Sequence, residues 1–124
     1  MKKSTCLFFA STLLLAACAE NKTDSAEETV IAAQAEISLP TIQCGKCTGI
    51  VEEALKAVEG VSLAKVDLSK KIASVSFDEN QVKLIDLEKA IAAEGYSANN
   101  TLRDAEAYQA LDKCCQEPAD GGGH

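Results

Sequence analysis

The chain has 124 residues, with 12 basic and 19 acidic side chains, a formal net charge of −7 and six cysteines. This length accommodates one small domain with extensions. The acidic excess argues against a nucleic-acid partner, because binding to a phosphate backbone requires clustered positive charge.

The first residues have the pattern of an export signal. Lys2 and Lys3 give a basic start, and Leu7–Ala17 is a largely apolar stretch. Because this stretch is too short to span a membrane as a permanent helix, it predicts a secretory signal.

The end of this segment, Leu15-Ala16-Ala17-Cys18, resembles the end of bacterial lipoprotein signals. The resemblance implies that residues 1–17 are cleaved as a signal peptide and that Cys18 is lipidated. Since two or more acyl chains anchor a protein stably, we expect the chain in a bacterial cell envelope, bound to a membrane and facing the periplasm or exterior. An ordinary signal peptide that happens to contain Cys18 is the alternative.

Residues 18–34 are polar and acidic, and we expect them to be a tether between the anchor and a folded domain. Loss of Lys2 and Lys3 reduces the basic count from 12 to 10 against 19 acids, which gives the mature chain a charge of −9. This charge mildly favours the attraction of cations.

The spacing of apolar residues predicts an ordered domain over residues 35–100. Strands are predicted where apolar and polar residues alternate, at 35–40, 64–68, 73–77 and 96–99. Helices are predicted over 48–58, closed by Gly60, and over 84–91, closed by Gly95. A third helix is expected over about 103–112, within a C-terminal extension, 101–124, that ends in a flexible tail.

The order strand, helix, strand, strand, helix, strand predicts an α+β protein with the ferredoxin-like βαββαβ fold. We expect an antiparallel sheet with two helices on one face. The predicted core residues are Val51, Leu55, Val66, Phe77, Leu87 and Ile91.

The sequence Cys44-Gly45-Lys46-Cys47 lies between the first predicted strand and the first predicted helix. A helix N-terminus stabilises anions, so both thiols are expected to ionise more easily than free cysteine. Thiolates select Cu(I), Zn(II) and similar soft ions. Two thiolates on a loop can hold such an ion and leave its other coordination positions open, which suits carrying a metal and passing it on.

Three other interpretations of these cysteines stay open. A thiol–disulfide oxidoreductase also carries two cysteines at this spacing, but such enzymes usually place a cis-proline opposite them, and neither Pro40 nor Pro118 is well situated for that. A closed structural zinc site would need Cys114 and Cys115 to join the loop. A simple disulfide between Cys44 and Cys47 is the third interpretation.

The segment Thr41–Cys47, together with Gly60-Val61 and Gly95-Tyr96, resembles the heavy-metal-associated (HMA) domain family over about residues 36–100. That family includes periplasmic mercury-binding proteins and copper chaperones. Its usual motif, Gly-Met-Thr-Cys-x-x-Cys, is kept here at both cysteines, with Thr41 at the glycine position and Ile42 at the methionine position.

The resemblance implies that Cys44 and Cys47 bind the metal, with Ile42 packed beneath the loop and Tyr96 beside it. Lys46 lies between the cysteines, where it can lower a thiol pKa or offset the charge of a metal–thiolate pair; an exposed lysine without a special role is the alternative.

The function implied is binding and transfer of a soft metal ion by a membrane-tethered metallochaperone or scavenger. Cu(I) and Hg(II) are the preferred ions and Zn(II) is a further candidate. The implied partner is a membrane metal transporter or P-type ATPase. No constellation of catalytic residues is recognisable in the sequence, so we expect a protein that is not an enzyme.

Cys114 and Cys115 are predicted to lie at the same end of the domain as Cys44 and Cys47. A helix over about 103–112 that folds back along the sheet would return the chain to that end, since ten helical residues rise about 15 Å. The pair would then extend the metal site to three or four thiolates, or exchange metal with it. A frayed tail, in which the two cysteines do nothing, is the alternative.

Overall fold

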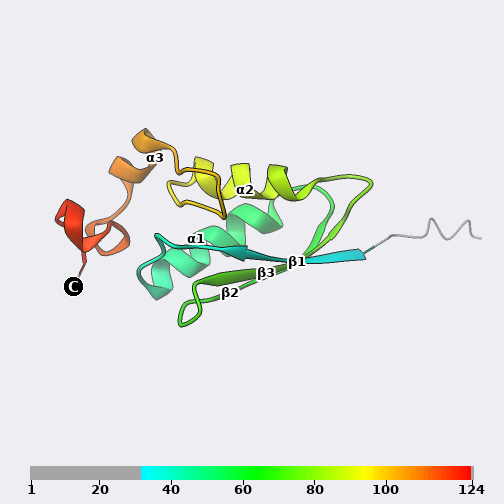
Figure 1. Cartoon of the computed structure of the whole chain (residues 1–124), viewed down its shortest axis with the longest axis horizontal. Helices are drawn as coiled ribbons and strands as arrows, with labels where there is room; N and C mark the ends of the chain where they lie inside the picture. Colours follow the sequence, from blue (N-terminus) through cyan, green and yellow to red (C-terminus); the bar gives the residue numbers. More distant parts are fainter. Residues whose placement is uncertain (1–31, 124) are drawn as a thin grey trace, which may run out of the picture.

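The computed structural model describes residues 32–123, so the predicted signal peptide and Cys18 lie outside it, with most of the tether. The helices and strands occur in the order β1 (Ala32–Ser38), α1 (Gly45–Lys56), β2 (Val61–Asp67), β3 (Ile72–Asp78), α2 (Leu84–Ala93) and α3 (Ala105–Ala110). Two short 3₁₀ turns, Lys113–Cys115 and Pro118–Asp120, follow α3. The expected α+β arrangement is present, with α1 and α2 on one face of the sheet and a C-terminal helix beyond them (Figure 1).

The sheet is antiparallel, and β3 lies between β1 and β2. Ser38 of β1 is opposite Ile72 of β3, and Val66 of β2 is opposite Ala73. The start of β1 is three residues earlier than predicted, because Ala32 already pairs with Asp78. This register brings the end of β1 to the same end of the domain as the start of α1.

The core lies between the helices and the sheet, as the apolar spacing predicts. Val51 and Leu55 of α1 and Leu87 and Ile91 of α2 are fully buried, and Phe77 is 3% exposed. Each such side chain contributes about 1.5–3 kcal/mol by leaving water. Val66 is only half-buried.

The fourth strand predicted at 96–99 is not formed, and the described sheet has three strands. The backbone amide of Asn99 does donate to the carbonyl of Ser38 (2.9 Å), and the Asn99 side-chain oxygen accepts from the Ser38 amide (2.9 Å). Pairing stops there because the chain reverses between Ala98 and Thr101, with Asn99 in the left-handed region at φ 48°. The carboxylate of Glu88 on α2 holds this turn by accepting from the side chains of Asn99 and Thr101.

Two predicted helices also have different bounds. α1 begins at Gly45, three residues earlier than expected, so that Cys47 belongs to its first turn. α3 is shorter than the predicted 103–112, because the side-chain amide of Gln116 donates to the carbonyls of Tyr108, Gln109 and Leu111. In a helix that continued to residue 112, the Tyr108 carbonyl would instead accept from the amide of Asp112.

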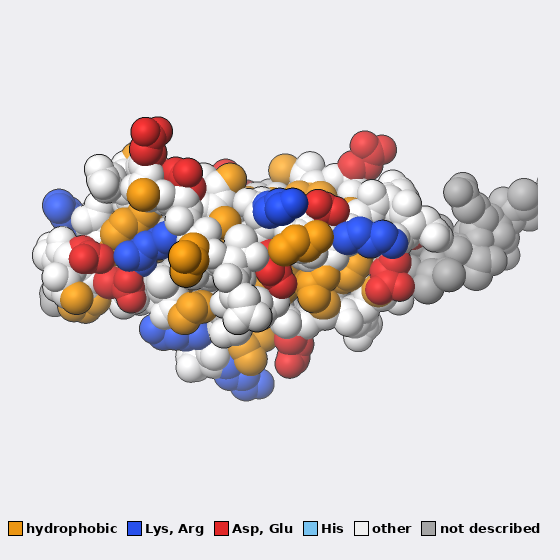
Figure 2. Space-filling view, turned by 45° about the horizontal axis from the view of Figure 1, so that its top comes forward, with side chains coloured by type: hydrophobic (Ala, Val, Ile, Leu, Met, Phe, Trp, Pro, Cys, Tyr) orange, Lys and Arg blue, Asp and Glu red, His pale blue; other side chains and the backbone are white. Residues whose placement is uncertain are grey.

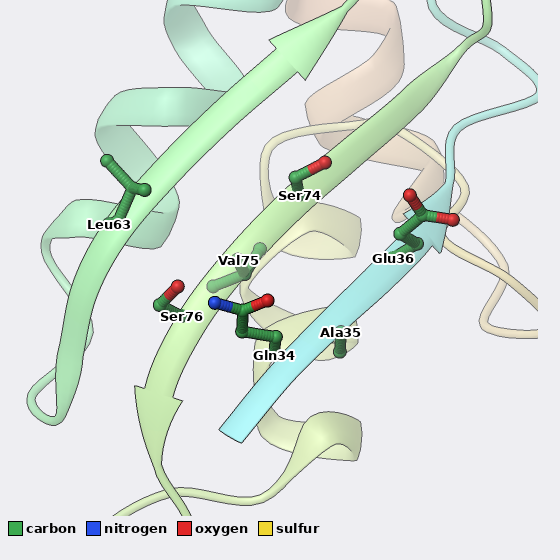
Figure 3. Close-up of a pocket in the computed structure, with 7 residues that line it drawn as sticks. All are labelled: Gln34, Ala35, Glu36, Leu63, Ser74, Val75 and Ser76. Carbon is green, nitrogen blue, oxygen red and sulfur yellow. The ribbon is translucent and has the colours of Figure 1, made fainter. Parts of the chain in front are cut away.

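The sheet face away from the helices is open. It carries a shallow hollow of about 390 Å³ lined by polar side chains of β1 and β3, with Leu63 of β2 at its side (Figure 3). No cysteine lines this hollow. On the helical side, apolar side chains lie among acidic and basic ones over the region of α2 (Figure 2), and Leu84 and Ile85 of that helix are exposed. Within residues 32–123, none of the helices has the length and apolar character needed to cross a bilayer.

Candidate metal centre

The N-terminus of α1 holds the first pair of cysteines. Cys44 is the N-cap residue, with an extended backbone at φ −148°, and Cys47 lies within the first helical turn. The Cys44 carbonyl accepts from the Thr48 amide (3.2 Å), and the Thr48 hydroxyl donates to the Gly45 carbonyl (2.7 Å). Both thiols therefore lie at the positive end of the helix dipole, where a thiolate is stabilised.

The four described cysteines are free thiols that gather at this end of the domain. The sulfur of Cys44 lies 3.0 Å from that of Cys47, 3.8 Å from that of Cys114 and 3.8 Å from that of Cys115. The sequence prediction that Cys114 and Cys115 lie beside the loop is therefore confirmed. That any of the four binds a metal stays a prediction.

The C-terminal extension reaches the loop by a route that differs from the predicted strand and long helix. After α3, the chain turns at Leu111 and enters the 3₁₀ turn that carries Cys114 and Cys115. An ion pair between Lys46 and Asp112 joins the extension to the loop. In Figure 1 the C-terminal extension lies at the same end of the domain as the loop that precedes α1.

Burial differs among the four thiols. The side chains of Cys47 and Cys115 are fully buried, Cys44 is 9% exposed and Cys114 is half-buried. The site is therefore closed to solvent at its base, and Cys114 is the most exposed of its four cysteines.

The pKa values of two thiols are shifted in opposite directions. Burial raises the pKa of Cys44, but hydrogen bonds from the thiol and backbone of Cys47, from Cys115 and from the backbone of Lys46 outweigh it and lower the pKa to about 7. Burial raises the pKa of Cys115 well above its ordinary value, and its contacts with Cys47 and Cys44 add to this effect. Of these two thiols, Cys44 is therefore the one that ionises near neutral pH.

Tyr96, expected beside the loop, is fully buried there. Burial raises the pKa of its hydroxyl, and the neighbouring thiols of Cys115 and Cys47 raise it further. This hydroxyl is the one buried side-chain oxygen or nitrogen in residues 32–123 without a hydrogen-bond partner of ordinary geometry. It is available to donate to a metal-bound thiolate.

Ile42 and Lys46 occupy the other two positions expected around the cysteines. Ile42 is fully buried in the same apolar cluster as Cys44 and Cys47, which fits the predicted role of packing beneath the loop. Lys46 is exposed and pairs with Asp112, whose hydrogen bond and charge raise the lysine pKa. The ion pair of Lys46 therefore joins the cysteine loop to the C-terminal extension.

Two residues that position the site were missed from the sequence. Asp112 pairs with Lys46, and the hydroxyl of Thr41 accepts a buried hydrogen bond from the Ser97 amide (3.0 Å) that ties the loop to the chain after α2. The substitution of threonine for the motif glycine at position 41 was a signal for the second contact. No local pattern identifies Asp112, because its partner is 66 residues away.

Residues 36–97 match the family model described as the heavy-metal-associated domain. The chain is 38% identical over 60 residues to the copper chaperone CopZ of Staphylococcus haemolyticus, which covers 48% of this chain and 88% of the relative. It is 38% identical over 68 residues to the mercuric transport protein periplasmic component of Shewanella putrefaciens, with 55% and 72% covered. The crystal structure of oxidized MerP from Ralstonia metallidurans is 32% identical, with a TM-score of 0.54, and covers 55% of this chain and 94% of that one.

The matched model contains Cys44, Cys47 and Tyr96, whereas α3, Cys114 and Cys115 lie beyond its end at residue 97. The residues matched by the family model, 36–97, extend from within β1 to beyond α2 and contain the loop with the paired cysteines. The chain belongs to the heavy-metal-associated domain family.

Proposed function

We propose that this protein binds one soft metal ion through Cys44 and Cys47 and passes it to another carrier. The observation that carries the proposal is the pair of thiols, 3.0 Å apart, at the N-terminus of α1. Thiolate sulfur prefers Cu(I) and related soft ions over hard ones. The relatives named as copper chaperone and as mercuric transport protein support Cu(I) or Hg(II) as the cargo, with Zn(II) as a further candidate.

Transfer would proceed by exchange of thiolate ligands. A two-thiolate site leaves coordination positions open, so that a thiolate of the recipient can bind before a donor thiolate leaves. Cys44, whose thiol pKa is lowered to about 7, provides a thiolate for this exchange at neutral pH. The metal is cargo, and the protein acts as a carrier and not as an enzyme.

We further propose that Cys18 carries a lipid anchor and that the protein works at a membrane of the bacterial cell envelope. The support is the sequence Leu15-Ala16-Ala17-Cys18 after a basic start and an apolar stretch. The partner that receives or supplies the metal would be a membrane metal transporter or a P-type ATPase, because an anchored carrier and such a transporter lie at the same membrane. Replacement Cys18→Ala is expected to move the protein from the membrane to the soluble fraction on cell fractionation.

Metal binding is tested by anaerobic titration of the reduced protein with Cu(I) in competition with a chromophoric chelator. Wild type is expected to remove one equivalent from the chelator, and Cys44→Ser with Cys47→Ser is expected to bind at least a hundredfold more weakly. Cys114→Ser with Cys115→Ser, which also removes two thiols, is the comparison variant and is expected still to bind one equivalent of Cu(I) through Cys44 and Cys47. Binding by the first double variant as tight as wild type would place the site elsewhere.

A thiol–disulfide oxidoreductase is the second candidate, since Cys44 has a pKa of about 7 and lies 3.0 Å from Cys47. A low-pKa thiol beside a second thiol is the arrangement that such enzymes use. An insulin-reduction assay separates the two functions. Sustained turnover by the metal-free protein would favour the enzyme, and its absence together with Cu(I) binding would favour the carrier.

A further inference from the structure

Three of the four thiols form a nearly equilateral triangle. The sulfur of Cys44 is 3.8 Å from those of Cys114 and Cys115, and the last two are 3.9 Å apart. The point equidistant from the three sulfurs is therefore about 2.2 Å from each, because the centre of such a triangle lies at its side divided by √3. Metal–thiolate bonds have a length of about 2.3 Å. The triangle already has the dimensions of a three-coordinate thiolate site.

The pair Cys44 and Cys47 does not have the dimensions of a two-coordinate site. Two thiolates on opposite sides of an ion, with bonds of about 2.3 Å, stand about 4.6 Å apart, whereas these two sulfurs are 3.0 Å apart. To bind an ion linearly, the pair must open. The Cys44–Cys114–Cys115 triangle needs almost no movement.

The extension is held in place by contacts that do not involve the cysteines. Lys46 pairs with Asp112, and Arg103 pairs with Glu117 (2.6 Å) and Asp120 (3.4 Å). These ion pairs flank the 3₁₀ turn that carries Cys114 and Cys115. The backbone around the second cysteine pair is therefore positioned before any metal arrives.

We propose that Cys44, Cys114 and Cys115 form a second, trigonal soft-metal site that shares Cys44 with the Cys44/Cys47 pair. The proposal rests on the proposed function, since it takes the same cargo. Cys44 remains bound while the ion moves from one set of ligands to the other. The extension thereby converts a two-coordinate thiolate site, suited to transfer, into a three-coordinate thiolate site, suited to retention.

The movement of Cu(I) between the two sites is a ligand exchange without electron transfer. The bond from copper to the Cys47 sulfur breaks, and bonds to the Cys114 and Cys115 sulfurs form. Those two thiols each release a proton, and the Cys47 thiolate takes one up, so that one proton is released overall. Copper stays Cu(I) throughout.

The test is copper K-edge X-ray absorption of the full chain loaded with one equivalent of Cu(I), without oxygen or added thiols. Wild type and Cys47→Ala are expected to show three sulfur ligands. The double variant Cys114→Ser with Cys115→Ser is expected to show two sulfur ligands, and to lose Cu(I) to a chelator at least tenfold faster than wild type. Metal-free circular dichroism checks that each variant is folded, and Cys47→Ser replaces Cys47→Ala if that variant is not.

Three sulfur ligands in the Cys47 variant would establish the second site. Two or fewer sulfur ligands in the Cys47 variant would overturn the second site and leave the Cys44/Cys47 site intact. Coordination and a release rate unchanged from wild type in the Cys114/Cys115 double variant would have the same meaning. Loss of all tight binding in the Cys114/Cys115 double variant would instead contradict the proposed function, because Cys44 and Cys47 would then be insufficient to hold the ion.

Discussion

The guanidinium carbon of Arg103 lies 3.5 Å from the centroid of the Tyr108 ring, so that the cation covers the aromatic face. The same guanidinium pairs with Glu117 and Asp120, and the Tyr108 hydroxyl donates to Asp120 (2.7 Å). One arginine thus links α3 to the end of the extension. The segment that carries Cys114 and Cys115 lies between these contacts.

Replacement Arg103→Leu is expected to loosen this segment. The side chain is 23% exposed, and loss of its charge-assisted hydrogen bonds and cation–π contact is worth about 2 kcal/mol. Amide hydrogen exchange in residues 113–123 should become about 30-fold faster, with α1 and β3 unaffected. The exposed pair of Lys70 with Asp67 provides the control, since Lys70→Ala should change nothing measurable. Equal exchange in both variants would show that Arg103 does not hold the segment.

Gly95 is a second position on which the extension depends. Its φ of +92° disfavours any side chain, and an added Cβ would lie 2.7 Å from the backbone nitrogen of Tyr108 and 2.8 Å from its Cα. Replacement Gly95→Ala is expected to lower the free energy of unfolding by about 2–4 kcal/mol, through backbone strain and displacement of α3.

Urea denaturation measures this effect. The matched control is Gly49→Ala, because Gly49 lies within α1 and an added Cβ there would meet nothing within 4 Å. That change is expected to stabilise the protein by about 0.5–1 kcal/mol. A shift of the denaturation midpoint in the same direction in both variants would contradict the inference that α3 lies too close to Gly95 for a side chain to fit.

The sequence predicted most of the fold because the signals involved are local. Alternating residues such as Ala73, Val75 and Phe77 identify β3, and the spacing of Leu87 and Ile91 identifies α2. The fourth strand could not be excluded in this way, because Tyr96–Asn99 has the composition of a strand. The strand does not form because the Glu88 side chain on α2 accepts from the Asn99 side chain and holds the turn there.

The candidate site, too, could be predicted from the sequence only where its signals are local. Cys44 and Cys47 were identified from their spacing and from the helix that follows them. The nearness of Cys114 and Cys115 was predicted from the length of a helix, and the structure achieves it by a different path, with a short α3, a 3₁₀ turn and the Lys46–Asp112 pair. Contacts between residues so far apart in sequence leave no periodic signal.

Substitutions of Ile42 test whether its side chain supports the loop that carries Cys44 and Cys47. Its side chain is fully buried, so Ile42→Ala is expected to cost about 2–4 kcal/mol of unfolding free energy by leaving a cavity. Ile42→Met, which restores the residue usual in the family, conserves volume and is expected to cost less than about 1.5 kcal/mol. Thermal unfolding of both variants measures the difference. Equal losses would mean that the loop does not rest on this side chain.

The last prediction concerns the ionisation of Cys44 in the reduced, metal-free protein. Because its pKa is lowered to about 7, half of the thiol is ionised near neutral pH, and the rate of alkylation by iodoacetamide should rise through pH 7 and level off above it. Cys115, whose pKa is raised and whose side chain is buried, should stay unmodified over this range. Mass spectrometry of the labelled peptides follows each cysteine separately.

Cys47→Ala provides the sharper form of this experiment. Burial raises the pKa of Cys44, and the hydrogen bond from the Cys47 side chain is the largest of the contributions that lower it. Alanine has no side-chain donor, so the midpoint of Cys44 alkylation should move upward, toward that of an ordinary cysteine. A wild-type midpoint already at the ordinary value would mean that the thiolate at the N-terminus of α1 is not stabilised, and the advantage of Cys44 as the first ligand for an incoming metal would be lost.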